Sequence, residues 1–151
     1  MSTRARIGII NRDDTIESVY HHWDGYPEWL GITLNEQYNK RDKVKELIKG
    51  GDMSCCWTTR RWNKEGGRDI EVGFNGANYY SYRNEKAPSE ISKNFDEYMK
   101  IDCGQEFAYI YTLENKWEAY QVYKKFSEDY KRIINTNVRS VEIPSNNEVI
   151  K

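Results

Sequence analysis

The chain of 151 residues has no long apolar run, only three cysteines and a formal charge of −1. A membrane-spanning helix needs about 18 or more consecutive apolar residues, so we expect no membrane partner. Two of the cysteines are adjacent, Cys55 and Cys56, and three provide no disulfide framework, which favours a reducing cytoplasm. Residues 1–6 are too polar for a signal peptide. Nucleic-acid polymers bind basic surfaces, so the near-zero charge argues against DNA or RNA as the partner.

Apolar residues are also scarce, at 38%, whereas aromatic residues are abundant, with 5 Trp, 12 Tyr and 4 Phe. Large rings bury much surface per residue and can replace aliphatic side chains in a core. A chain of this length is expected to form one domain. We expect that domain to span residues 1–134. Residues 135–151 are polar and poorly patterned, which predicts a loosely structured C-terminal tail.

The hydrophobic patterns predict an antiparallel sheet decorated by three or four helices, an α+β fold. The expected strands form a hairpin (4–10 and 15–22), a three-stranded meander (53–62, 68–74 and 77–83) and a second hairpin (105–113 and 116–123). Asn75-Gly76 favours a tight turn between the last two strands of the meander.

Four helices are expected between or after these strands. The first begins at Pro27, because proline suits the first turn of a helix. The second is expected to be capped by Asp42 and the third by Ser89. The last is expected over about residues 124–134.

Two histidines and an aspartate stand close together at His21, His22 and Asp24. Adjacent residues of a strand point to opposite faces, so the two histidines are not expected to face one ion. No second group of histidines or cysteines has the spacing of a metal site. We therefore predict neither a metal nor a cofactor.

A thiol hydrolase would combine Cys55 or Cys56 with His21 or His22 and with Asp24. Cysteine at alternating strand positions is more typical of a core. The sequence also shows no glycine-rich phosphate loop and no distinct pair of catalytic carboxylates. A binding protein is therefore favoured over an enzyme. The alternatives are a small nucleotide hydrolase that uses these residues and a module that binds another protein through exposed aromatic residues.

Aromatic residues are interspersed with arginine and asparagine in three stretches. These are 23–29 (WDGYPEW), 57–62 (WTTRRW) and 78–83 (NYYSYR). Rings stack on nucleobases, guanidinium groups bind phosphates, and asparagine can bond a base edge. This pattern favours a small nucleotide as the ligand.

The same pattern suggests roles for individual residues. The base is expected to stack on Trp23 or Tyr80. Arginine and asparagine supply the polar contacts: Arg60 and Arg83 to phosphate, and Asn78 to base or ribose. Trp62 is expected to close the pocket, either of its own subunit or of a neighbouring one.

The N-terminal third carries a longer motif. Residues 4–9 (RARIGI) are followed by 18–28 (SVYHHWDGYPE) and then by Gly31 and Leu34. The arrangement resembles a family of small bacteriophage proteins with a Tyr-x-His-Trp-Asp-Gly-Tyr-Pro core. Some members resemble the Thoeris anti-defence sponge proteins, which bind the cyclic ADP-ribose isomer made by the host's TIR-domain enzyme without cleaving it. The match covers roughly the first 55 residues.

The resemblance implies a non-enzymatic phage protein that sequesters a small cyclic nucleotide in the cytoplasm of the infected bacterium. It also implies a homo-oligomer, a dimer or higher, because related sponges share pockets between subunits. Some of those sponges also bind cyclic trinucleotides. The resemblance transfers a ligand-binding role to His22, Trp23, Asp24 and Tyr26.

Overall fold

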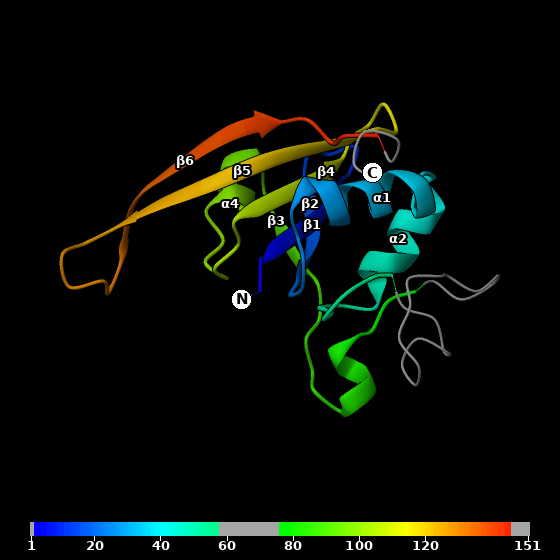
Figure 1. Cartoon of the computed structure of the whole chain (residues 1–151), viewed down its shortest axis with the longest axis horizontal. Helices are drawn as coiled ribbons and strands as arrows, with labels where there is room; N and C mark the ends of the chain where they lie inside the picture. Colours follow the sequence, from blue (N-terminus) through cyan, green and yellow to red (C-terminus); the bar gives the residue numbers. More distant parts are fainter. Residues whose placement is uncertain (1, 58–75, 146–151) are drawn as a thin grey trace.

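The computed structural model describes residues 2–57 and 76–145, except for the side chain of Arg83. Six strands form one sheet in the order β3-β2-β1-β4-β5-β6 (Figure 1). Their bounds are β1 Ala5–Ile10, β2 Ile16–His21, β3 Glu90–Ser92, β4 Phe107–Tyr111, β5 Trp117–Phe126 and β6 Ile133–Val141. Every neighbouring pair is antiparallel except β1 and β4, which are parallel. The predicted α+β class is confirmed, although the sheet is mixed rather than purely antiparallel.

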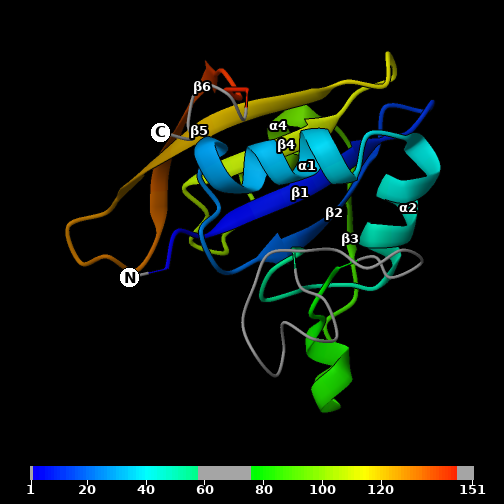
Figure 2. The same ribbon diagram turned by 45° about the vertical axis from the view of Figure 1, so that its right-hand side comes forward.

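Helices lie on both faces of the sheet. Figure 2 shows α1 and α2 on one face and α4 on the other. The helical segments are η1 Pro27–Gly31, α1 Ile32–Gln37, α2 Arg41–Lys49, η2 Tyr80–Arg83 and α4 Phe95–Met99. None of the described helices is both long enough and apolar enough to cross a membrane.

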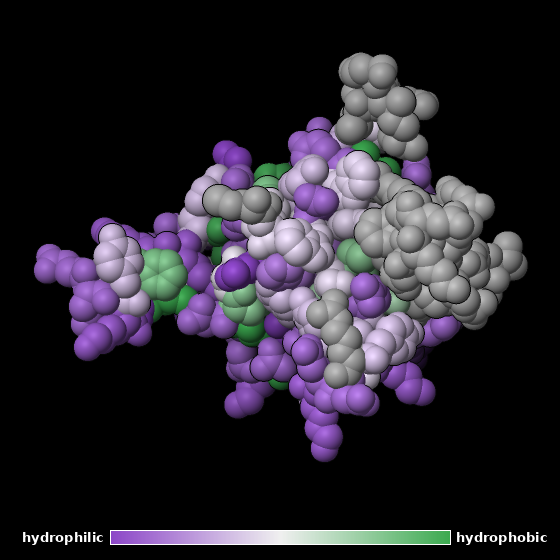
Figure 3. Space-filling model, turned by 60° about the horizontal axis from the view of Figure 1, so that its bottom comes forward, coloured by the Kyte–Doolittle hydropathy of each residue, from purple (hydrophilic) through white to green (hydrophobic). Residues whose placement is uncertain are grey.

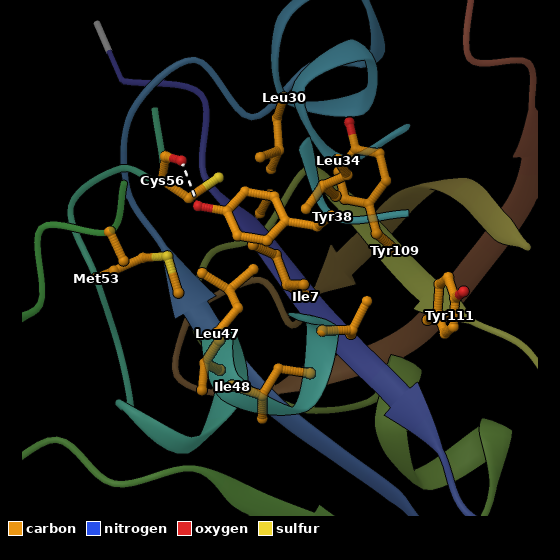
Figure 4. Close-up of a cluster of buried hydrophobic side chains, with 14 of the residues drawn as sticks. Ile7, Leu30, Leu34, Tyr38, Leu47, Ile48, Met53, Cys56, Tyr109 and Tyr111 are labelled. Carbon is orange, nitrogen blue, oxygen red and sulfur yellow. Dashed lines mark hydrogen bonds between the residues drawn. The ribbon is translucent and has the colours of Figure 1, made fainter. Parts of the chain in front are cut away.

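The main core lies between the sheet and the helices η1, α1 and α2. Ile7, Leu34 and Leu47 are fully buried there, and Figure 4 shows their side chains converging. The tyrosines of this core direct their hydroxyls to backbone carbonyls: that of Tyr38 donates to Cys56 O at 2.8 Å. Because the polar atom of the ring is satisfied, the rest of the ring can be buried as an apolar side chain.

The opposite face has a smaller core beneath α4. Tyr98 and Met99 of α4 pack with Ile16 and Ile110 of the sheet. Helix α4 packs closely against the sheet because residue 8, in β1, is glycine. A Cβ atom on Gly8 would lie 2.9 Å from Ile16 Cγ2 and 3.1 Å from the Tyr98 ring, closer than packed side chains tolerate.

The first hairpin and the helices after it form as predicted, with one difference at a cap. Pro27 begins η1, and α2 carries Val44, Leu47 and Ile48 on its buried face. Helix α2 begins at Arg41, so Asp42 lies in its first turn instead of capping it.

The meander differs from its prediction. Met53 makes isolated bridges with His21 and Tyr79. The strands expected over 53–62 and 77–83 are wrong in their described parts. Residues 53–57 and 77–79 contain isolated bridges but no strand, and Tyr80–Arg83 is a 3-10 helix in which the Tyr82 N–H bonds to Tyr79 O. These turn bonds replace the cross-strand bonds that a continuing strand would need. The strand expected over 68–74 lies outside the described residues.

The helix predicted from Ser89 is also displaced. Glu90–Ser92 is a short strand that pairs with β2, and the Ser89 hydroxyl bonds to the Glu17 carboxylate at 2.6 Å. The helix starts later, where the Asn94 side chain accepts the Glu97 N–H at 2.9 Å. A helix with a side-chain cap therefore does form in this region. The first residues predicted for it instead pair with the edge of the sheet.

The helix predicted over 124–134 is wrong, and so is the loose structure expected for residues 135–141. Strand β5 continues to Phe126, and Ile133–Val141 returns beside it as β6. The second hairpin, β4 with β5, forms as predicted. Isoleucine, valine, threonine and asparagine dominate β6. Side chains branched at Cβ favour strands, and pairing with β5 satisfies the backbone.

Candidate functional site

An open cleft of about 580 Å³ lies on the face of the sheet opposite α1 and α2. Pockets of this volume accommodate small ligands. Side chains of β1 and β2 enter it because they alternate with those of the main core. The residues lining the cleft are Arg6, Tyr20, Asp52, Glu90, Ile101, Asp102 and Cys103.

Arg6 is the most deeply buried residue of the cleft, with 2% of its surface exposed. A buried guanidinium needs hydrogen-bonding partners to offset its lost hydration. Its Nε donates to Ser18 Oγ at 2.8 Å, and its Nη2 donates to Glu90 Oε2 at 2.7 Å. Ser18 comes from the neighbouring strand and fixes the plane of the guanidinium.

The two members of the ion pair are buried to very different degrees. The side chain of Arg6 is 3% exposed, whereas that of Glu90 is 60% exposed. A third contact, from Arg6 Nη1 to Cys103 Sγ, spans 3.8 Å. The guanidinium is therefore held in place by the sheet, while its carboxylate partner lies mainly in solvent.

Asp52 closes a gap in the edge of β2. The Tyr20 N–H donates to Asp52 Oδ1 at 2.8 Å, and Tyr20 O accepts from the Met53 N–H at 2.9 Å. The carboxylate thus takes the place of a strand partner between β3 and Met53. Burial raises the pKa of Asp52. This side chain stabilises the sheet edge and also brings an acidic group to the cleft.

Tyr20 connects the cleft to the motif at residues 21–26. Its hydroxyl and His22 Nδ1 lie 2.6 Å apart. Burial raises the pKa of Tyr20 to about 12, and Arg4 and Tyr80 act on this pKa in opposite directions. Burial and the charge of Arg4 lower the pKa of His22. Both rings are therefore neutral at pH 7 and act through hydrogen bonds.

Lys124 is a second cation near Arg6. Its Nζ donates to Ile101 O at 2.5 Å and to Gln105 Oε1 at 2.6 Å. Burial lowers the pKa of Lys124, as does the charge of Arg6, whereas Asp102 raises it. Arg4 is a third cation in this region, and its charge acts on Tyr20 and His22. The site thus presents mixed charges that suit a ligand with both phosphate and hydroxyl groups.

Some of the predicted ligand residues meet at this place. His22 contacts Tyr20, and Tyr80 acts on the same phenol. The Trp23 ring lies edge-on to His22 at 4.7 Å between centroids, and 48% of Trp23 is exposed. His22 and Trp23 therefore form the aromatic side of the candidate site, and Tyr80 lies near enough to act on the pKa of Tyr20.

Other predicted ligand residues are part of turns or of backbone hydrogen bonds between segments. Asp24 has φ of 48° and makes a left-handed turn. Tyr26 precedes η1, and its carbonyl accepts from Trp29 and Leu30. The backbone of Asn78 bonds to Ser54. Arg60, Trp62 and the side chain of Arg83 lie outside the described part of the chain.

Part of the Asp-Gly-Tyr-Pro signature has a structural explanation. A Cβ atom on Gly25 would lie 2.6 Å from that of Ala5, so only glycine allows this contact. The Gly25 carbonyl accepts the hydroxyl of buried Tyr109 at 2.6 Å. The signature therefore fixes a turn against the sheet and leaves His22 and Trp23 beside the cleft.

The other histidine of the motif lies on the opposite side of the sheet, in the main core. His21 is completely buried, and its ring lies 5.2 Å from that of Trp57. Neither ring nitrogen has a hydrogen-bond partner among the described residues. Burial lowers the pKa of His21 to about 3. The two adjacent histidines thus point to opposite faces, as the strand period predicts.

The cysteines of the hydrolase hypothesis are buried in the main core. Cys55 is 4% exposed and Cys56 is 0% exposed, and burial raises the pKa of Cys55. The thiolate is the reactive form of cysteine, so this environment disfavours it as a nucleophile. Across residues 2–57 and 76–145, no three His, Cys, Asp or Glu side chains gather in a way suited to a metal ion.

The sequence interpretation did not single out the main residues of the cleft. Arg6 carried a usable signal, because it is a charged residue between the buried Ala5 and Ile7 of one strand. Such a residue must find partners on the other face of the sheet. Glu90 and Cys103 carry no comparable signal, since each reaches Arg6 from a distant part of the chain.

No family model matches the chain, and neither a curated protein nor a solved structure matches it at a significant level. The residues of the cleft and the aromatic group beside it are the basis for assigning a function.

Proposed function

We propose that this protein binds a cyclic ADP-ribose-type signalling nucleotide and sequesters it without degrading it. The observation that carries the proposal is the geometry of Arg6. The sheet holds its guanidinium at an open cleft, and its partner Glu90 is mostly in solvent. A phosphate of the ligand can replace the Glu90 carboxylate and form a charge-assisted, bidentate contact with Arg6.

The aromatic group supplies the second half of the recognition. Trp23 exposes about half of its surface beside His22, and an adenine base stacked on it would gain about 1–3 kcal/mol. Tyr20 and His22 lie between this ring and Arg6 and offer hydrogen bonds to the riboses. A nucleotide with one base and a pyrophosphate therefore matches the order of groups along the site.

The protonation of these groups favours retention over cleavage. General acid–base catalysis is efficient when a group has a pKa near the working pH and reaches the reacting proton. The phenol of Tyr20 has its pKa raised to about 12, and His22 Nδ1 is occupied by that phenol. Asp52 Oδ1 accepts the Tyr20 N–H. These contacts support a role for all three residues in binding.

The biological setting of the proposal comes from the resemblance to phage anti-defence sponges. In that setting the protein acts in the cytoplasm of an infected bacterium, as a homo-oligomer, and removes the signal that activates host immunity. Ligand residues outside the described ranges, Arg60 and Trp62 among them, belong to the same proposal.

Calorimetric titration with the cyclic ADP-ribose isomer tests binding, and recovery of the ligand tests retention. The complex is heated until the protein denatures, and the released nucleotide is analysed by mass spectrometry. We expect saturable binding and an unchanged ligand mass. A hydrolysed product would support the nucleotide hydrolase instead, and the absence of binding would refute the proposed ligand.

A further inference from the structure

Strands β5 and β6 extend beyond the rest of the sheet. Strand β4 pairs only with residues 117–121 of β5, so the remainder of β5 and the first part of β6 form a projecting two-stranded arm (Figure 1). Its free end carries exposed rings, and Figure 3 shows apolar and pale side chains on it among hydrophilic ones. Phe126 is 41% exposed, Tyr130 81% and Ile134 52%.

The outer edge of β6 presents backbone groups that can pair with another strand. Val122 directs its N–H to Glu106 O, away from β6. In an antiparallel ladder its partner Val138 therefore directs its own N–H and C=O outward. The strand period gives Thr136 and Ser140 the same orientation. Across the described residues, no backbone group bonds to these three positions from outside the β5–β6 ladder.

The two edges of the sheet differ in how far they are protected. Edge strand β3 is 3 residues long and begins with Glu90, which suits an edge that avoids pairing. Edge strand β6 is 9 residues long, contains no proline, and has Arg139 as its sole charged residue. A long edge with so little charge is a surface for strand addition.

We infer that β6 pairs antiparallel with β6 of a second copy of this chain, around a two-fold axis near Asn137 and Val138. In a register centred on Asn137, Arg139 faces Asn135 of the partner subunit. Centred on Val138, it faces Asn137 of the partner subunit. Both registers place each guanidinium opposite a neutral asparagine, so no like charges face each other across the paired edges.

The same symmetry also accounts for the arm. An antiparallel pair places the free end of one arm beside the far end of the partner's β6. At that far end, an open groove of about 550 Å³ is lined in part by Trp117, Val141 and Ile143. The exposed rings of the arm thus reach a groove of mixed lining on the second copy, in which Trp117, Val141 and Ile143 lie beside polar residues such as Glu118 and Glu142. The interface is isologous, so both subunits make the same contact.

This inference specifies the interface of the homo-oligomer in the proposed function, but it does not depend on the ligand. Its test is the mass in solution, measured by light scattering and sedimentation over a range of protein concentrations without nucleotide. We expect a mass of twice 18.0 kDa for the unaltered chain. A monomer at every concentration overturns the interface, while the ligand titration still decides the binding function separately.

Thr136→Pro removes one outward N–H and leaves the bonds to β5 in place. We expect a folded monomer, with the circular dichroism spectrum of the unaltered chain. The matched control Thr136→Val keeps the N–H and should remain a dimer. A folded Thr136→Pro variant that stays dimeric overturns the inference.

Cross-linking tests the pairing of the two β6 strands even if the proline variant does not fold. Asn137→Cys and Val138→Cys each place a thiol near the proposed axis, where the two strands are close enough for a disulfide. Under mild oxidation we expect a covalent dimer from at least one variant and none from the unaltered chain. The absence of a covalent dimer from both variants contradicts the pairing.

Discussion

Strand β1 directs Ile7 to one face of the sheet and Arg6 to the other. The two faces differ in the hydrogen-bond partners of their polar side chains. On the face covered by α1 and α2, polar groups are few, and tyrosine hydroxyls such as that of Tyr38 bond to backbone carbonyls. On the cleft face, polar side chains bond to one another, as Arg6 does with Ser18 and Glu90. The first arrangement stabilises a core, and the second holds charged groups at an open cleft.

Under the proposed function, one short strand serves stability and recognition at once. Side chains alternate, so a substitution at one position affects one face and leaves the other largely intact. The same division appears in β2, where the buried His21 lies on the core face and His22 lies beside the cleft. Substitutions matched across the two faces therefore test the account.

The largest effect is expected in the main core. Leu47→Ala removes a fully buried side chain and should lower the free energy of unfolding by about 2–5 kcal/mol. Urea denaturation measures this change. On the cleft face, Asp102→Ala is the control and should change the unfolding free energy by no more than about 0.5 kcal/mol. Similar losses of unfolding free energy for both variants would contradict the proposed division between the two faces of the sheet.

The next effect appears at acid pH and separates the two histidines. Burial lowers the pKa of His21 to about 3, from 6.5 in the unfolded chain. Below pH 6.5 the unfolded chain therefore takes up a proton that the folded protein does not. The stabilisation is complete above 6.5 and is lost as the pH falls, by about 1.4 kcal/mol per pH unit.

His21→Phe removes this titration while keeping a ring against Trp57. Between pH 6.5 and about pH 4.5, the unaltered protein should lose about 2–3 kcal/mol more unfolding free energy than the variant. Denaturant titrations at each pH measure the difference. His22→Phe, at the cleft, is the comparison. The pKa of His22 is lowered as well, so this variant should also reduce the acid slope, but by less than His21→Phe. Equal slopes for the His21→Phe variant and the unaltered protein would show that His21 is not buried as a neutral ring.

A smaller effect compares two tyrosine hydroxyls. Tyr38→Phe removes a donor from the buried Cys56 carbonyl and should cost about 1–2 kcal/mol of unfolding free energy. The Tyr120 hydroxyl bonds to the exposed Glu118 carboxylate at 2.7 Å, so Tyr120→Phe should cost less than Tyr38→Phe. Thermal or urea unfolding of the two variants ranks them. The reverse order would contradict the burial of Tyr38.

Much of the fold could be predicted from local patterns. The hairpins and the first two helices follow from alternating apolar residues, turn residues and Pro27. The failures occur where a distant partner decides the structure. Residues 124–126 and 133–141 became paired strands because β5 and β6 satisfy each other's backbones, and Glu90–Ser92 joined the edge of β2 instead of a helix.

The candidate site was predictable only in part, for the same reason. The Tyr-x-His-Trp motif directed attention to His22 and Trp23, which lie beside Tyr20 of the cleft. The charged half of the site depends on Arg6 meeting Glu90 and Cys103, which are 84 and 97 residues away in the chain. No local spacing encodes such a meeting, although a single arginine within an apolar strand indicates that partners must exist.

The measurement that tests the central claim most directly is the affinity of Arg6→Gln for the cyclic ADP-ribose isomer, determined by calorimetry beside the exposed control Arg12→Gln. If Arg6 binds the phosphate of the ligand, its loss should weaken binding about 10- to 100-fold, while the control keeps the affinity of the unaltered protein. A folded Arg6→Gln variant that binds as tightly as the unaltered protein would contradict the account.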